Sequence, residues 1–262
     1  MQFFKMQNQG NDYIFLFERP TKQQVIALCD RNFGVGGDGV VYIYNKDGTY
    51  GYEIYNKDGS KATFCGSVTL ALGLYIYKKE GKNKFSIITD SGKKKIEVVK
   101  NGERIKVCLW VDKPRFFIKE KLFNRLIFLK SENKILRIRA TFVDVGNKHL
   151  VVRGLYNEEM RKRIVCAIKE NHFFAGGINV EFVERLSSSR ARVIVYERGS
   201  GKTLCCSSGA CAVFATLNKL GHFSNRAELN FDGGKMLAEK QGKRIKISSY
   251  PKFVYFGNRC EL

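Results

Sequence analysis

The sequence predicts an α+β fold with two pseudo-symmetric domains, each a curved mixed or antiparallel sheet around a central helix. The main observation is an internal repeat. YNKDGSKATFC, from Tyr55 to Cys65, returns 141 residues later as YERGSGKTLCC, from Tyr196 to Cys206. A second observation is the chain-long series of short apolar segments separated by Gly- and Asn-containing turns, which is typical of strands. One copy of the repeat in each half favours a duplicated scaffold.

The short apolar segments predict strands in both halves of the chain. In the first half they cover residues 3–7, 12–17, 40–45, 50–56, 85–90, 95–100 and 104–111. In the second half they cover residues 139–145, 149–154, 178–184, 190–197, 227–232, 235–240 and 244–249.

Four helices are expected, at residues 22–30, after Cys65, at about 157–169, and after Cys206. Pro114 lies near the midpoint and is the best candidate for a crossover between domains. We therefore expect one domain at residues 1–113 and a second at 114–251. A final strand at 252–257, within the terminal segment 252–262, is expected to return to the first domain.

The composition is that of a globular protein. With 44% hydrophobic residues, the chain of 262 residues is long enough to bury a sizeable core. It has no apolar run of the length that crosses a membrane, and its first residues do not resemble a cleaved signal, so we expect a cytoplasmic protein without membrane association. The net charge of +21 is spread over turns and strand faces, which favours a solvated surface over a nucleic-acid-binding patch.

The eight cysteines indicate free thiols. Nothing in the sequence suggests secretion, and disulfides are rare in reducing compartments. The chain contains no CxxC pair and its three histidines are scattered, so we expect no metal site. No motif for an organic cofactor is present either, because the Gly-rich GVGGDG segment follows no convincing βαβ pattern.

Two of the thiols, Cys65 and Cys206, precede helical patterns. A helix N-terminus stabilises thiolate, so one cysteine can act as a base while the other remains a thiol acid. Such a pair suits removal of a proton from one face of a carbon and its return to the other. The ten-residue spacing from the tyrosine selects Cys206 rather than Cys205. A substrate carboxylate is expected to bind the backbone N–H groups of four small residues. These are Gly66, Ser67, Ser207 and Ser208.

With these residues identified, the chain resembles the diaminopimelate epimerase family from end to end. The matching segments, in family order, are GNDY (10–13), RNFGVGGDGV (31–40), YNKDGS before Cys65-Gly66, VGNKH (145–149), GINVEFV (177–183), and YERGSGKT followed by CCSSGAC. Two departures are CGSVTL, where the family has Cys-Gly-Asn-Gly-x-Arg, and Ser207, where it has glycine.

The resemblance implies a cofactor-independent epimerase with its site between two similar α/β domains. It implies a role in lysine and peptidoglycan-precursor biosynthesis and a homodimeric assembly. It also places a second polar set where the family holds its substrate. These residues are Asn11, Asn56, Asn147, Asn179, Glu197 and Arg198. By charge, Arg198 suits a carboxylate and Glu197 an ammonium, which together match the distal end of diaminopimelate.

Three alternatives stay open at the level of sequence. A racemase of another amino acid, such as histidine or a lanthionine-like diamino diacid, would keep both cysteines and change the distal contacts. An isomerase of the phenazine-biosynthesis type would share the fold but lack the cysteine pair. A basic nucleic-acid-binding protein would need a clustered positive face.

Overall fold

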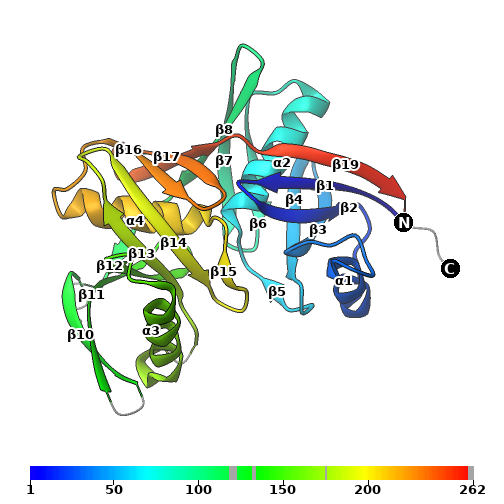
Figure 1. The fold of residues 1–262 in the computed structure, drawn as a ribbon. Helices are drawn as coiled ribbons and strands as arrows, with labels where there is room; N and C mark the ends of the chain where they lie inside the picture. Colours follow the sequence, from blue (N-terminus) through cyan, green and yellow to red (C-terminus); the bar gives the residue numbers. More distant parts are fainter. Residues whose placement is uncertain (118–122, 132–133, 175, 259–262) are drawn as a thin grey trace. The chain divides into compact units, whose positions relative to one another are not determined.

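The computed structural model describes residues 1–117, 123–131, 134–174 and 176–258. The chain divides into two compact units, which we name unit 1 (Met1–Trp110 with Ser248–Leu262) and unit 2 (Val111–Ile247). Figure 1 labels their helices and strands.

Unit 1 contains two helices and most of the N-terminal strands. Its elements are β1 (Gln2–Asn8), β2 (Asn11–Leu16), α1 (Lys22–Cys29), β3 (Gly39–Lys46), β4 (Thr49–Asn56), β5 (Lys61–Ala62), α2 (Gly66–Glu80), β6 (Lys84–Thr89), β7 (Gly92–Asn101), β8 (Arg104–Val111, which ends in unit 2) and β19 (Lys252–Asn258). Strand β19 pairs antiparallel with β1, which joins the C-terminal strand to the N-terminal sheet.

Unit 2 contains the remaining elements. They are β9 (Arg115–Phe116), β10 (Arg125–Ser131), β11 (Lys134–Asp144), β12 (Lys148–Arg153), α3 (Glu158–Glu170), a short 3₁₀ turn (His172–Phe174), β13 (Asn179–Arg185), β14 (Arg190–Glu197), β15 (Gly201–Thr203), α4 (Ser207–Lys219), β16 (Arg226–Phe231), β17 (Gly234–Gln241) and β18 (Arg244–Ser249, which ends in unit 1).

The two units have the same order and pairing of strands and helices. The repeat therefore extends well beyond the cysteine segments. Strands β1 and β2 form an antiparallel pair, α1 leads to β3 parallel to β2, and β4 returns antiparallel. The short β5 precedes α2, after which β6 lies parallel to β4 and pairs with β7. Strands β11–β17, with α3 and α4, follow the same path with the same pairings. This result confirms the predicted α+β class.

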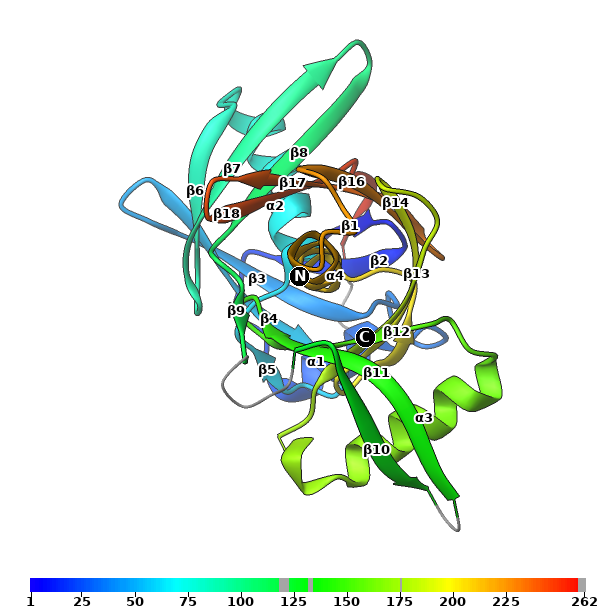
Figure 2. The same cartoon turned by 90° about the vertical axis from the view of Figure 1, so that its left-hand side faces the viewer.

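Helix α4 is the centre of unit 2. Figure 2 shows it nearly along its axis, with strands of its own unit around it, and it contacts β11, β12, β13, β16 and β17. Its residues from Ser207 to Leu217 are all buried. In unit 1, α2 is likewise buried from Gly66 to Leu74. Apolar residues on all sides of both helices explain this burial, because a helix that is hydrophobic all round needs cover on every face.

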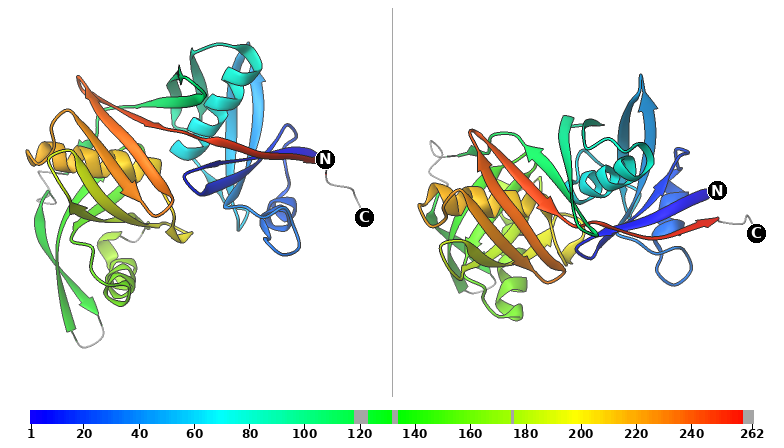
Figure 3. Two further views of the ribbon diagram at one scale, coloured as in Figure 1. Left: turned by 45° about the horizontal axis from the view of Figure 1, so that its top comes forward. Right: turned by 90° about the horizontal axis from the view of Figure 1, so that it is seen from above.

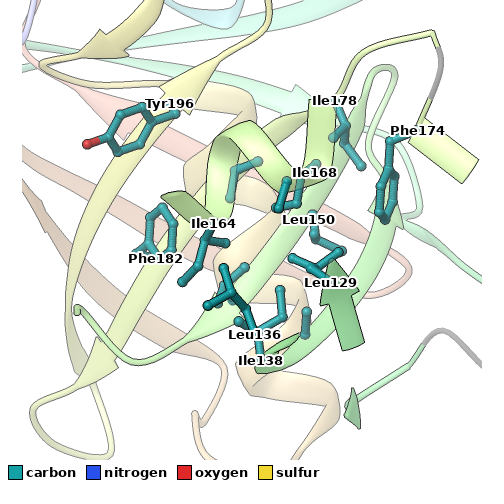
Figure 4. Close-up of a cluster of buried hydrophobic side chains, with 14 of the residues drawn as sticks. Leu129, Leu136, Ile138, Leu150, Ile164, Ile168, Phe174, Ile178, Phe182 and Tyr196 are labelled. Atoms are coloured by element: carbon teal, nitrogen blue, oxygen red, sulfur yellow. The ribbon is translucent and has the colours of Figure 1, made fainter. Parts of the chain in front are cut away.

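Helix α3 lies across the unit 2 strands from α4 (Figure 3), contacts β10 and shares a buried cluster with residues of β11, β12 and β13. Side chains alternate along a strand, so Val180 and Phe182 of β13 face α3 while Glu181 between them faces α4. The apolar stripe of α3, including Ile164 and Ile168, completes this cluster, which Figure 4 shows. The alternation of a single strand thus places a carboxylate beside the start of α4.

Sequence patterns predicted all four helices, each to within a residue or two of its ends where ends were given. Local capping explains the start of α1, where Thr21 and Gln24 form a capping box, and of α3, where Asn157 accepts from the Met160 N–H. The pattern missed the short strands β5, β9 and β15, and also β10. Strand β10 lies in a charge-rich segment, and its Phe128 is 56% exposed, so it carries a weak burial signal.

None of the helices in the described part of the chain is long and apolar enough to cross a membrane.

We predict that Phe182→Ala destabilises the protein by about 3–5 kcal/mol, because it leaves a cavity beneath α3. Phe182 is fully buried and makes edge contacts with Tyr156 and Tyr196 at ring-centroid distances of 5.9 Å each. Urea denaturation measures the change. The control, Phe128→Ala on β10, should cost less than about 1 kcal/mol because its ring is largely exposed. Equal losses for the two variants would contradict the assigned core.

Candidate active site

Cys65 and Cys206 occupy the same position in their units, the N-cap of the central helix. Their backbone angles nearly coincide, with φ −137° and ψ 120° for Cys65, and φ −138° and ψ 118° for Cys206. Both residues are extended, so each thiol lies just before the first helical turn. The positive end of the helix dipole at this position favours thiolate.

In unit 1, two tyrosines surround Cys65. The Tyr52 hydroxyl lies 3.3 Å from the Cys65 N–H, 3.1 Å from the Cys65 carbonyl and 2.8 Å from Thr69 Oγ1. Burial raises the pKa of Tyr52, so this hydroxyl stays neutral and holds the N-cap backbone in place. The Tyr13 hydroxyl lies 3.6 Å from Cys65 Sγ. The half-buried thiol of Cys65 therefore has a phenol as a direct neighbour.

In unit 2, a chain of hydrogen bonds leads from the buried thiol of Cys206 to a buried carboxylate. Cys206 Sγ lies 3.3 Å from both the Gly209 N–H and Ser208 Oγ. The Asn147 side-chain amide donates to Ser208 Oγ over 3.2 Å, and Asn147 Oδ1 lies 2.9 Å from His149 Nε2.

The chain ends at Glu181, whose Oε1 lies 2.7 Å from His149 Nδ1. Both side chains are fully buried. Gly209 has to be glycine here, because a Cβ on it would lie 2.7 Å from Glu181 Oε1. The absence of a side chain at Gly209 thus lets the carboxylate approach the first turn of α4.

A second carboxylate, Glu197, also lies beside Cys206. Its Oε1 accepts from the Thr203 hydroxyl over 2.6 Å, and it forms a hydrogen bond with the Cys206 side chain. Burial raises the pKa of Glu197. Burial, followed by the charge of Glu197, raises the pKa of the Cys206 thiol well above its usual value. Cys206 is therefore a thiol rather than a thiolate at neutral pH.

The strand register within each unit shows which residues of the two units are equivalent. Tyr13 pairs with Gly39 in unit 1, and His149 pairs with Asn179 in unit 2. By the same count Asn11 corresponds to Asn147, Val41 to Glu181, and Asn56 to Glu197. The imidazole of His149 thus corresponds to a phenol in unit 1. The two carboxylates, Glu181 and Glu197, correspond to an alkyl group and an amide.

The remaining predicted polar residues hold backbone segments close to these sites. Asn56 donates to Ser60 Oγ over 3.0 Å within the turn before Cys65. Asn179 accepts from the Arg198 N–H over 2.9 Å and donates to the Lys148 carbonyl over 3.2 Å. Asn11 is buried at the start of β2.

Arg198 and Glu197 do not form an ion pair, since their side chains have different partners. The exposed guanidinium of Arg198 donates to the Gly176 carbonyl over 3.2 Å, whereas Glu197 contacts Thr203 and Cys206. Gly177 has φ +74°, and a Cβ there would lie 2.6 Å from Arg198 Cδ, so this glycine makes room for the arginine side chain.

The Gly-rich segment of unit 1 is held by an ionic cluster. Lys5 Nζ lies 2.8 Å from Asp12, while Arg31 bridges Asp12 and Asp38 at 2.7 Å and 3.0 Å. The interactions with Arg31 and Lys5 outweigh burial, so the pKa of Asp12 is lowered. These charges fix the end of β2 that carries Asn11.

Sequence reasoning left His149 undecided and missed Glu181, Thr203 and Tyr13. The one available signal was Glu181, a charged residue within the apolar strand INVEFV. Within the described residues, no group of His, Cys, Asp and Glu side chains has the arrangement needed to hold a metal ion.

Comparison with known proteins identifies the family to which the chain belongs. The sequence profile of the family described as diaminopimelate epimerase matches residues 3–114 and 141–250. The chain belongs to the diaminopimelate epimerase family. It is thus an isomerase of that family.

Individual relatives match along nearly the whole chain. Diaminopimelate epimerase of Natranaerobius thermophilus is 35% identical and covers 90% of each chain. That of Leptospira biflexa is 29% identical over 100% of this chain and 99% of its own.

Solved structures with lower identity share the fold. A probable proline racemase from Agrobacterium radiobacter K84 has a TM-score of 0.75 at 12% identity, covering 99% of this chain and 92% of its own. A phenazine biosynthesis protein of the PhzF family from Bacillus anthracis has a TM-score of 0.71 at 11% identity, covering 98% of each chain.

We predict that Glu197→Gln speeds the alkylation of Cys206 several-fold at pH 8. Removing the neighbouring negative charge lowers the thiol pKa and increases the thiolate fraction, which is the reactive form. Timed iodoacetamide labelling with peptide mass spectrometry measures the rate. Glu184→Gln, on the exposed end of β13, serves as the control. Slower labelling of Cys206 in Glu197→Gln would show that Glu197 supports the thiolate instead.

Proposed function

We propose that this enzyme interconverts LL- and meso-diaminopimelate without a cofactor, using Cys65 and Cys206 as the two proton-transfer groups. The observation that carries the proposal is the matching N-cap conformation of the two cysteines in units that otherwise differ in their titratable residues. Family membership supports the reaction class.

In the proposed mechanism, one cysteine acts as thiolate and takes the α-proton of the substrate. The carbanion that forms receives a proton on its opposite face from the other cysteine, which remains as thiolate; the reverse reaction uses the two groups in exchanged roles. Cys206, which is a thiol at neutral pH, suits the proton donor, and Cys65 suits the base. Backbone N–H groups of Gly66, Ser67, Ser207 and Ser208 would bind the α-carboxylate and stabilise the developing charge.

The distal end of the substrate would contact Arg198 and the asparagines. The exposed Arg198 guanidinium has a fork of donors that matches a carboxylate. Asn11, Asn56, Asn147 and Asn179 supply amides on both units. Glu197 lies next to Cys206, so its charge acts on the thiol and on an ammonium group near the reacting carbon.

The cellular setting follows from the family. We propose that the enzyme acts in the cytoplasm in lysine and peptidoglycan-precursor biosynthesis, as a homodimer. Strand β19 supports a second copy as partner, since its Val254 and Phe256 are 50% and 70% exposed. An apolar strand face of this kind is suited to burial against another chain.

We predict that Cys65→Ser and Cys206→Ser each reduce epimerisation by several orders of magnitude, because both proton-transfer partners are required. Proton exchange at the α-carbon in deuterated buffer, followed by NMR, measures activity. Cys205→Ser is the matched control, since Cys205 is buried next to Cys206 and precedes the N-cap. An inactive Cys205→Ser with an active Cys206→Ser would contradict the assignment.

We further predict that diaminopimelate is turned over at least about a hundredfold better than any mono-amino acid. A mono-amino acid cannot form the distal contacts with Arg198, and a hydrogen bond to a charged group contributes about 1.5–3 kcal/mol. Loss of such contacts corresponds to about a hundredfold, since about 1.4 kcal/mol corresponds to tenfold. A panel of amino acids in the same exchange assay tests this selectivity.

Arg198→Met should abolish diaminopimelate turnover while both cysteines still react with an alkylating reagent. Faster turnover of histidine or another mono-amino acid by the wild-type enzyme would refute the substrate assignment and leave the two-thiol chemistry intact.

A further inference from the structure

We infer that Glu181 is a positioning residue for Cys206: through His149, Asn147 and Ser208 it aims a hydroxyl donor at the sulfur and stabilises the thiolate that forms when Cys206 gives up its proton. The inference rests on the proposed function for the step in which Cys206 ionises. The geometry of the hydrogen-bond chain, in contrast, is independent of the substrate.

The hydrogen bonds from His149 to Cys206 all run in one direction. Asn147 donates its N–H to Ser208 Oγ, so the hydroxyl hydrogen of Ser208 is available for Cys206 Sγ. Asn147 Oδ1 can only accept, and His149 Nε2 must therefore carry a hydrogen. Every donor along the chain then points toward the sulfur.

Glu181 shares a proton with His149 at the end of the hydrogen-bond chain. Because Nε2 carries a hydrogen, one further proton has to lie between His149 Nδ1 and Glu181 Oε1, which are 2.7 Å apart. The pair is then neutral as a whole, whether that proton resides on the ring or on the carboxyl. Glu181 fixes the orientation of the ring, and the ring cancels the negative charge that would otherwise oppose a thiolate at Cys206.

The scaffold does not need a carboxylate at the position of Glu181. In unit 1, Val41 occupies the equivalent register position and is fully buried. The same strand and helix thus pack with an alkyl group. A buried carboxylate in unit 2 replaces a side chain that would cost nothing to bury, which favours a role in the chemistry of Cys206.

The groups that face Cys206 come from three strands and from its own helix. Glu197 comes from β14, Glu181 from β13 and the His149–Asn147 pair from β12 and the turn before it, while Ser208 and Gly209 belong to α4. Glu197 has hydrogen bonds with Thr203 and with the Cys206 side chain, and none with an imidazole is found among the described residues. Its charge therefore has no neutralising partner of this kind and raises the pKa of the thiol. The two carboxylates are therefore expected to have opposite effects when neutralised.

The test compares Glu181→Val, which copies unit 1, with the near-isosteric Glu181→Gln. Iodoacetamide labelling of Cys206, with no substrate present, should be at least about tenfold slower in Glu181→Val. It should stay within about threefold of wild type in Glu181→Gln, whose amide can still donate to Nδ1. Glu184→Gln on the same strand is the control. Faster labelling in both variants would mean that Glu181 acts as a bare charge, and unchanged labelling in Glu181→Val would mean that it has no influence; either result overturns the inference.

Two further readouts separate positioning from folding. In nitrogen-15 NMR spectra of the wild-type protein, His149 should carry a hydrogen on Nε2, and a bare Nε2 would refute the direction of the chain. In the exchange assay, Glu181→Val should lower kcat about a hundredfold, the size of effect that a misplacement of about 1 Å produces, with little change in KM because Glu181 is fully buried. A larger change in KM than in kcat would assign Glu181 to substrate binding. If diaminopimelate is not a substrate, the labelling and NMR results still decide the role of Glu181.

Discussion

Both candidate catalytic thiols depend on one backbone geometry, an extended cysteine at the N-cap of a helix that is almost entirely buried. The extended residue ends the incoming chain and leaves the first N–H groups of the helix without partners within the helix. Small residues follow each cysteine, so a ligand can approach these N–H groups. The sheet around each helix buries its first turns, including the small residues that follow the cysteine, so the N-cap lies in surroundings of low polarity. Loss of the N-cap geometry would separate the thiol from the amides that we propose bind the substrate carboxylate.

A duplicated scaffold creates a difficulty for two-base catalysis, since two identical thiols would have the same proton affinity. One must be a thiolate when the other is a thiol. The substitutions between the units resolve this. Around Cys206 the strands place Glu197 and the Glu181–His149 pair, whereas unit 1 has Asn56, Val41 and Tyr13 at the equivalent positions. The backbones of the two units are alike, but the charges beside the two thiols differ, and the charge of Glu197 favours the protonated form of Cys206.

The sequence allowed the helices, most strands and the position of both cysteines before a helix to be predicted because their signals are local. Hydrophobic periodicity marks the helices, and the Tyr-to-Cys repeat marks the two N-caps. The neighbours of the thiols were not predictable in this way. Glu181 reaches Cys206 only because β13 lies parallel to β12 and presents alternate residues to α4, and His149 meets it only through that pairing. Similarly, Glu197 and Arg198 are adjacent in sequence, which suggested one charged pair, but Glu197 ends β14 and Arg198 begins the following turn, and their side chains have different partners.

The departures from the family motif are consistent with a site that binds anions through its backbone. Ser67 and Ser207 stand at positions after the cysteines where the family has Asn and Gly, and a main-chain N–H is supplied equally by each of these residue types. Ser208 differs in kind, because its hydroxyl contacts Cys206 Sγ and accepts from Asn147. A hydroxyl at this position can rotate and exchange donor and acceptor roles as the sulfur ionises. In the proposed mechanism, the turn at the start of α4 therefore combines two functions: its main-chain N–H groups would bind the substrate, while the Ser208 side chain contacts the thiol.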